Sequence, residues 1–267
     1  MIKPVFGAAG EGIIFASDDE ILHRYDFPMG QVILEEFLNL DRTADRIVLS
    51  PAVHYLGKAQ FGKGLVDQII IGTGYQGWRR SKASKSFQAT CSRAIAKILK
   101  GIKPCGPGGF DFLSVENVPY LTDVNTGRFN GAHYPKLFLE QYAPDKTFYC
   151  FKFKPPPTLS VSQFWYRLQA ADIAFTPGQS DTGVFPLVYL RGLSGLYICL
   201  ASTDEECVAL YEQAKVCLAE RTPMTKIEAP QDMVSKVEMT RRCHLYARAF
   251  ILLGYSPGWH KDRRATW

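Results

Sequence analysis

Two strand-like runs that lie close together in the sequence constrain this chain more than any other feature. Residues 108–113 carry Asp111, and residues 120–125 carry Asp123 and Asn125. Side chains alternate between the two faces of a strand, so Asp123 and Asn125, two positions apart, share one face. If the two strands are neighbours, three oxygen-bearing side chains come together. Oxygen ligands of this kind suit Mg²⁺, particularly where the ion also bridges nucleotide phosphates.

A simpler interpretation of the same pattern is a β-hairpin whose polar side chains face water. Antiparallel strands often leave one face solvated, and the sequence from Asn125 to Gly127 suits a turn. The two strands alone do not decide between a metal site and a solvated hairpin.

Length and charge narrow the classes of protein that the chain can belong to. Its 267 residues, of which 46% are apolar, suffice for one large domain or two small ones. The net charge of +5 is spread along the chain, which argues against a nucleic-acid-binding protein but suits an anionic ligand such as a nucleotide. The densest basic run, residues 79–85, is expected to be a solvated loop unless a phosphate site lies beside it.

The cysteines and the apolar segments bear on the compartment. The seven cysteines form no CxxC pair and no zinc-type spacing, which favours a reducing compartment. We see no signal peptide and no apolar run near the roughly 18 residues that cross a bilayer. We therefore expect a soluble, cytoplasmic protein that binds neither nucleic acid nor membrane.

Strand-like and helix-like segments mix along the chain, which predicts an α+β fold. Strands are expected at residues 1–6, 12–16, 31–38, 46–50, 68–72, 108–113, 120–125, 148–153, 185–190 and 195–201, and helices at 17–25, 86–100, 133–140, 160–170, 202–220 and 231–253. Three prolines from Pro155 make a stiff joint, so we predict domains at residues 1–154 and 155–267. Because a strand begins at the first residue, we also expect the first domain to be incomplete at its N-terminus and to need a missing N-terminal domain.

Taken in order, the segments of residues 1–142 resemble the ATP-grasp superfamily of carboxylate–amine ligases. The resemblance implies an ATP-grasp fold, in which antiparallel sheets with flanking helices hold a nucleotide between two lobes, followed here by a small α/β C-terminal domain. Members of the superfamily cover the nucleotide phosphates with a glycine-rich loop, the flap. The resemblance implies that Lys3, on the strand before this flap, is a phosphate-contacting and catalytic residue. The glycine-rich flap over the phosphates corresponds to Gly7, Gly10 and Gly12.

The same resemblance assigns the remaining site residues. Adenine contacts are implied for Glu35, Glu36, Phe37 and Leu38, and a ribose contact for Asp41. Metal ligation is implied for Asp111, Asp123 and Asn125, with Asp123 standing where relatives usually have the longer glutamate. Arg128 corresponds to a catalytic arginine that stabilises phosphate charge, although one extra residue separates it from Asn125.

The activity that the resemblance implies is ATP-dependent activation of a carboxylate, as an acyl phosphate, for attack by an amine. Its cofactors would be ATP and Mg²⁺, with Mn²⁺ as a substitute, and its partners a nucleotide and small-molecule or peptide substrates. The segments from Phe175 to Leu187 and from Ser202 to Glu206 resemble the C-terminal domain of pheganomycin-type peptide ligases.

Other functions fit the same residues. A non-catalytic nucleotide-binding module, or a truncated and inactive homologue, would keep the motifs, and a non-nucleotide α+β protein could carry them by coincidence. His133 follows the metal strand and is a candidate substrate contact, while packing or capping at the start of a helix is the alternative.

Overall fold

The computed structural model describes residues 2–4, 13, 32–36, 38–44, 46–62, 64–71, 74–102, 104, 106–127, 129 and 131–219. Several predictions lie outside these residues: the flap glycines Gly7, Gly10 and Gly12, the residues Phe37 and Arg128, and the segments 17–25 and 231–253. Lys3 is described by its backbone alone.

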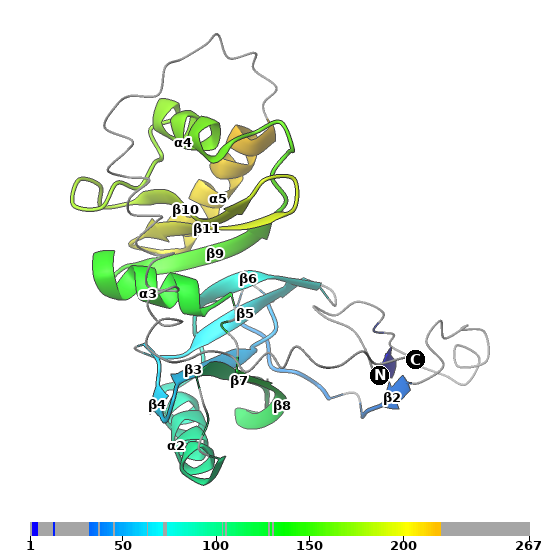
Figure 1. Cartoon of the computed structure of the whole chain (residues 1–267). Helices are drawn as coiled ribbons and strands as arrows, with labels where there is room; N and C mark the ends of the chain where they lie inside the picture. Colours follow the sequence, from blue (N-terminus) through cyan, green and yellow to red (C-terminus); the bar gives the residue numbers. More distant parts are fainter. Residues whose placement is uncertain are drawn as a thin grey trace, which may run out of the picture.

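A nine-stranded antiparallel sheet forms the centre of the molecule (Figure 1). Its strand order is β10-β11-β9-β6-β5-β3-β7-β8, and β4 pairs with β3 beside this path. The strands are β3 (Pro51–Leu56), β4 (Ala59–Gln60), β5 (Val66–Ile71), β6 (Gly74–Arg80), β7 (Pro107–Val115), β8 (Val118–Thr126), β9 (Thr147–Phe153), β10 (Gly183–Leu190) and β11 (Ser194–Ala201). With its flanking helices this sheet confirms the α+β prediction.

In the described part of the chain, four helices pack on the sheet: α2 (Lys85–Ile102), α3 (His133–Tyr142), α4 (Val161–Ala170) and α5 (Asp204–Ala219). Helix α2 buries Phe87, Cys91, Ile95 and Leu99, whose spacing of four residues makes one apolar stripe. That stripe packs against Val53 and Phe110 on one face of the sheet. Helix α3 packs its own apolar side chains against Ala52, Val66 and Trp78 on the opposite face.

Capping side chains explain why α4 and α5 begin where they do. The Ser160 hydroxyl accepts a hydrogen bond from the Gln163 N–H, and the Gln163 side chain accepts one from the Ser160 N–H. Glu206 accepts in the same way from Thr203 N–H, while the Thr203 hydroxyl accepts from Glu206 N–H. Each reciprocal pair satisfies donors that the first helical turn would leave unpaired.

A separate two-stranded sheet joins β1 (Ile2–Pro4) to β2 (Val32–Leu34). Lys3 pairs with Ile33 in its register. In Figure 1 this small sheet lies to one side of the large one.

Some sequence predictions differ from the structure. Residues 46–50 make only an isolated bridge between Arg42 and Val48, and the strand begins at Pro51. The basic run predicted as a solvated loop instead begins inside β6, where Arg79 is buried. The boundary placed at Pro155 falls between β9 and α4, and the sheet continues across it because β9 pairs with β11. The division into two domains stays a prediction.

Candidate functional site

The hairpin of β7 and β8 brings Asp111, Asp123 and Asn125 together. Asp111 stands opposite Asp123 and Gly109 opposite Asn125, so all three polar side chains lie on one face of the hairpin. The side-chain amide of Asn125 donates hydrogen bonds to Asp111 Oδ2 at 3.2 Å and to Asp123 Oδ2 at 3.0 Å. Asp111 and Asn125 are buried, whereas Asp123 is exposed.

This arrangement fits a small divalent cation. The Asp111 and Asp123 carboxylates each turn one oxygen towards the Asn125 amide nitrogen. Two negative charges that face the same point favour a cation there. Carboxylate and amide oxygens are also hard ligands of the type that Mg²⁺ selects. With an ion bound, the carboxylates would contact the ion and no longer the N–H groups of Asn125. The Asn125 side chain would then turn its Oδ1 towards the ion. Within the described ranges, no group of three or more His, Cys, Asp and Glu side chains forms a metal cluster, so the amide is an essential member of this set.

A close backbone approach positions Asn125. A methyl group on Gly108 would lie 2.4 Å from the Asn125 carbonyl oxygen and 2.2 Å from the Tyr55 ring, so no larger residue fits there. The Tyr55 hydroxyl lies 3.5 Å from the same carbonyl. Glycine at this point lets β8 approach the sheet closely enough to turn Asn125 towards Asp111.

Asp41 anchors the turn that joins β7 to β8. Its carboxylate accepts hydrogen bonds from the Ser114 hydroxyl at 2.6 Å, from Asn117 N–H at 2.7 Å and from Glu116 N–H at 3.0 Å. The bond from Ser114 is the main cause of a lowered Asp41 pKa, with the Asn117 N–H second. Both oxygens are engaged in holding the hairpin, so Asp41 has a structural role, and its ribose contact stays a prediction.

The residues expected at the nucleotide base lie on another part of the fold. Glu35 and Glu36 follow β2 directly and are exposed, and Leu38 is half-buried. Together with Lys3 on β1, they belong to the small sheet and its continuation. The group of Asp111, Asp123 and Asn125, here called the carboxylate–amide group, belongs to the large sheet. The structure thus brings together the three predicted metal ligands and leaves the predicted base-contacting residues on a different element.

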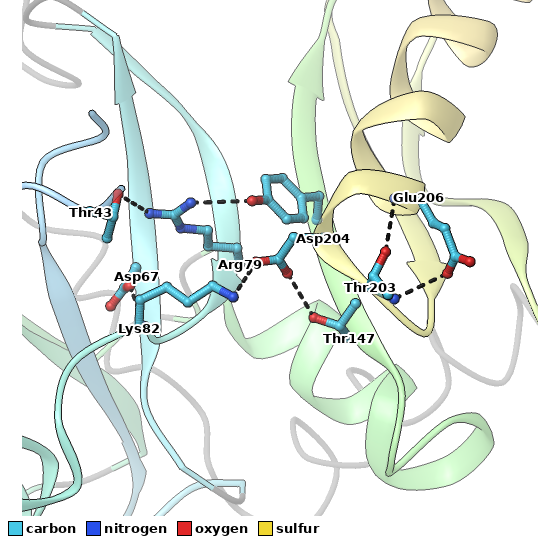
Figure 2. Close-up of polar contacts among 9 residues, drawn as sticks. Thr43, Asp67, Arg79, Lys82, Thr147, Thr203, Asp204 and Glu206 are labelled. Carbon is cyan, nitrogen blue, oxygen red and sulfur yellow. Dashed lines mark hydrogen bonds and ion pairs between the residues drawn. The ribbon is translucent and has the colours of Figure 1, made fainter. Parts of the chain in front are cut away.

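The buried arginine of the basic run does not face the hairpin site. Arg79 stands opposite Asp67, and Asp67 opposite Pro51, which places both side chains on the face away from Asp111, the partner of Ala52. Its guanidinium donates to Thr43 Oγ1 at 3.0 Å and to the Tyr149 hydroxyl at 3.2 Å (Figure 2). These contacts give Arg79 a structural role between β6 and its neighbours.

Neighbouring groups complete this network between β5, β6 and α5 (Figure 2). Asp67 accepts a hydrogen bond from Lys82 N–H at 2.7 Å, and the Lys82 ammonium pairs with Asp204 at the start of α5. Asp204 also accepts a hydrogen bond from Thr147 at 3.0 Å. Burial raises the pKa of Asp67, and the charges of Arg79 and Lys82 oppose that rise.

His133 is fully buried among aromatic rings. Its ring centroid lies 4.9 Å from those of His54 and Phe129 and 5.3 Å from that of Phe61. One ring nitrogen, Nε2, lies 3.4 Å from the Tyr55 carbonyl oxygen. These contacts are those of packing at the start of α3, the alternative left open by the sequence.

Several side chains on the site face were not found from the sequence. His54 stands opposite Gly109 on the face of Asp111, and its ring lies 5.4 Å from that of Trp78. Tyr75 packs on Trp78 at 5.5 Å. The period-two pattern of residues 51–56 was available as a signal, but it shows which face is polar only once the pairing of β3 with β7 is known.

Lys136 on α3 is also buried on this side. Its ammonium donates to the carbonyls of Phe61 at 3.1 Å and Gly64 at 3.0 Å, which ties the loop before β5 to the helix. Burial lowers the pKa of Lys136 to about 8, partly offset by Glu140.

Among the helices of the described residues, none has the length and apolarity to span a membrane.

Comparisons with known proteins bear on the fold. Neither a protein-family model nor a curated protein sequence matches this chain. Among solved structures, it is similar to N5-carboxyaminoimidazole ribonucleotide synthetase from Thermus thermophilus, with a TM-score of 0.51 and 13% identity over 78% of this chain. The chain spans 59% of the length of that enzyme.

Two further structures overlap less closely. An N5-carboxyaminoimidazole synthase from Aspergillus clavatus, in complex with ADP and 5-aminoimadazole ribonucleotide, has a TM-score of 0.44 and 11% identity over 64% of this chain and 51% of that one. Glycinamide-RNase-transformylase T from Mycobacterium tuberculosis has a TM-score of 0.44 and 13% identity over 71% of this chain and 58% of that one. The similarity to the Thermus enzyme, joined to the antiparallel sheet and its flanking helices, shows that this chain has the ATP-grasp fold.

Proposed function

We propose that this protein is an ATP- and Mg²⁺-dependent ligase that activates a carboxylate for attack by an amine. The observation that carries the proposal is the group on the β7–β8 hairpin, where one amide bridges two carboxylates on a single face. The ATP-grasp fold and the order of motifs from Lys3 to Arg128 support it. The carboxylate and the amine, including the peptide units that the pheganomycin-type resemblance suggests, belong to the finer part of the proposal.

The proposed reaction has two steps. A carboxylate oxygen attacks the γ-phosphorus of ATP and ADP leaves, which gives an acyl phosphate. The amine then attacks the carbonyl carbon, inorganic phosphate leaves, and the nitrogen loses a proton. Phosphoryl transfer of this kind depends mostly on positioning and on neutralising charge.

Each proposed site residue has a role in those steps. Asp111, Asp123 and Asn125 would hold Mg²⁺, which neutralises phosphate charge when bound. Lys3, Arg128 and the flap N–H groups of Gly7, Gly10 and Gly12 would contact the phosphates. Glu35, Glu36, Phe37 and Leu38 would meet the adenine.

Nucleotide binding by the full chain tests the first half of the proposal. We expect calorimetry to detect ADP binding that requires Mg²⁺, and expect Asp123→Ala to weaken it at least about tenfold because a metal ligand is lost. Glu116→Gln is the matched control, since it removes a carboxylate from the same hairpin at the exposed turn. Absence of Mg²⁺-dependent nucleotide binding in the wild-type protein would contradict the proposal.

Turnover tests the second half. ADP release should require both a carboxylate and an amine, and Asp123→Ala should abolish it. Nucleotide binding without turnover across a panel of carboxylates and amines would instead favour the non-catalytic binding module.

A further inference from the structure

The register of β7 against β8 decides whether the proposed metal ligands can meet. Asp111 stands opposite Asp123, but the pairing shifts between Asp111 and Phe112, so Thr122 on β8 is an extra residue with no residue opposite it. A slip of one residue would bring Thr122 opposite Asp111 and turn Asp123 to the other face of the hairpin. The metal site therefore needs one particular register.

The turn that joins the two strands sets this register. Val115 pairs with Val118, which leaves a turn of two residues, Glu116 and Asn117. Both have a positive φ, 52° for Glu116 and 60° for Asn117. A type I′ hairpin turn requires that sign of φ at both positions. Asparagine tolerates it, but for glutamate it costs free energy, so the turn sequence alone does not favour this hairpin.

Asp41 stabilises the turn from a distant part of the chain. Its carboxylate accepts a hydrogen bond from each turn N–H, that of Glu116 at 3.0 Å and that of Asn117 at 2.7 Å, and a third from the Ser114 hydroxyl at 2.6 Å. The Ser114 hydroxyl is the main cause of the lowered Asp41 pKa, so the carboxylate stays ionised at neutral pH. One side chain thus holds both turn residues in their unusual conformation.

Asp41 is itself fixed to the large sheet by its backbone. Its N–H donates to the Ser114 carbonyl at 2.8 Å, and its carbonyl accepts from the Leu49 N–H at 2.9 Å. Ser114 lies three residues along β7 from Asp111, which is about 10 Å at the rise of a strand. Asp41 is therefore an anchor for the turn, and it lies too far along the hairpin to be a ligand of the same ion.

We propose that Asp41 is a positioning residue for the divalent ion: by holding the β7–β8 turn, it fixes the register that places Asp123 opposite Asp111. This rests on the proposed metal site for the identity of the ligand. The register and its anchor do not depend on that function. In this role Asp41 acts through the turn and not on the ion.

Electron paramagnetic resonance of Mn²⁺, added to the full chain without nucleotide, measures binding of the ion directly. Asp41→Asn keeps the size of the side chain but replaces one acceptor oxygen by an NH₂ group, which cannot accept from the turn. We expect this variant to bind Mn²⁺ about tenfold more weakly or worse, as for other residues that orient metal ligands. Asp181→Asn removes an exposed carboxylate that pairs with Lys146, and as the matched control it should bind Mn²⁺ like the wild type.

A redesigned turn separates positioning from a general loss of folding. Glu116→Asn together with Asn117→Gly gives the turn the sequence Asn-Gly, which strongly favours type I′ without help from outside. In this background, Asp41→Asn should bind Mn²⁺ nearly as tightly as the redesigned turn with Asp41 intact. That reference is needed because Asn117→Gly also removes the hydrogen bond from the Ser84 hydroxyl to Asn117 Oδ1.

The Asn125 side chain reports the same register without any metal. Its amide donates to Asp111 and Asp123, so its ¹⁵N resonance depends on how the two strands are aligned. The resonance is assigned by its loss in Asn125→Ala. We expect Asp41→Asn to shift it and the redesigned turn to bring it back.

Two results would overturn the inference. Asp41→Asn could keep the Mn²⁺ affinity and the Asn125 resonance of the wild type, or the redesigned turn could restore neither, which would mean that Asp41 does not act through the turn. A wild-type protein that binds no Mn²⁺ would refute the proposed metal site instead. In that case the Asn125 resonance alone decides whether Asp41 sets the register of the hairpin.

Discussion

At the residue scale, the Asn125 amide donates hydrogen bonds to two carboxylates that would otherwise repel each other. Replacing Asn125 by alanine removes the one amide that donates to both Asp111 and Asp123 in the described residues. We expect Asn125→Ala to lower the free energy of unfolding by about 1–2 kcal/mol in the absence of metal. Added Mg²⁺ should restore part of that loss if both carboxylates still bind the ion.

Thermal unfolding with and without Mg²⁺ measures this effect. Thr126→Ala, at the next and exposed position of β8, is the control and should change stability little. A variant at Asn125 as stable as the wild type would mean that the amide is not needed to hold the carboxylates.

Lys136 predicts a pH dependence. Its pKa is lowered to about 8 in the folded protein, below the 10.5 of a free lysine, so the unfolded chain binds more protons between these values. Stability must therefore rise with pH in that window. Relative to Lys136→Met, the wild type should gain about 2 kcal/mol from about pH 7.5 to about pH 9.5.

Denaturant unfolding at several pH values compares the two proteins. The neutral amine can still donate to the Phe61 and Gly64 carbonyls, so the loop stays attached as the proton leaves. Parallel stability curves for wild type and Lys136→Met would contradict the lowered pKa.

At the scale of elements, the contact between β6 and β9 depends on one glycine. A side chain at Gly77 would lie 1.9 Å from the Cys150 carbonyl oxygen, a backbone atom that cannot move aside without breaking the pairing. We expect Gly77→Ala to cost more than about 3 kcal/mol, measured by denaturant unfolding. Gly101→Ala on α2, where nothing lies within 4 Å, is the matched control and should stabilise slightly.

Two cations in the network around Arg79 differ in burial: Arg79 is buried, whereas Lys82 is partly exposed. Arg79→Met would remove the larger of the two cationic charges that act on the buried Asp67, at a cost of about 3–5 kcal/mol. Lys82→Met removes a partly exposed pair with Asp204 and should cost about 1 kcal/mol or less. Equal losses of stability in the two variants would mean that burial does not control this network.

The same elements show what the sequence could and could not predict. The helix at residues 86–100 and the strands around Asp111 and Asn125 were predicted because each has a clear period of its own. The burial of Arg79 was not predicted, because a basic run looks solvated until its strand is known to lie inside a sheet. The anchoring role of Asp41 was missed for a related reason: its contacts with Glu116 and Asn117 join segments far apart in the sequence and leave no local pattern.

At the scale of the whole molecule, the sheet joins both sides of the predicted boundary at residue 154. Strand β9 lies between β6, which precedes it by a long segment, and β11, which follows it. A protein that ends at residue 154 would expose the apolar edge and face of β9. We expect it to be insoluble or unfolded, whereas one that ends at residue 219 should keep a cooperative unfolding transition.

Circular dichroism during thermal unfolding distinguishes these outcomes. A stable, cooperative fragment of residues 1–154 would establish two independently folding domains, as the prolines predicted. The buried cysteines give a second check on the whole fold, because burial raises the pKa of Cys91 to about 12 and leaves its thiol unreactive in the folded state.

The pairing of Gly77 with Phe151, which joins β6 to β9, has a consequence for how the chain reaches its structure. The β7–β8 hairpin closes over a turn of two residues, so it can form within microseconds of collapse. The pairing of β6 with β9 must wait until more than half of the described chain has been synthesised and the intervening loop entropy has been lost. On the ribosome, the edge of β6 therefore stays open while residues 81–146 emerge, and an open strand edge is a place where chains can aggregate.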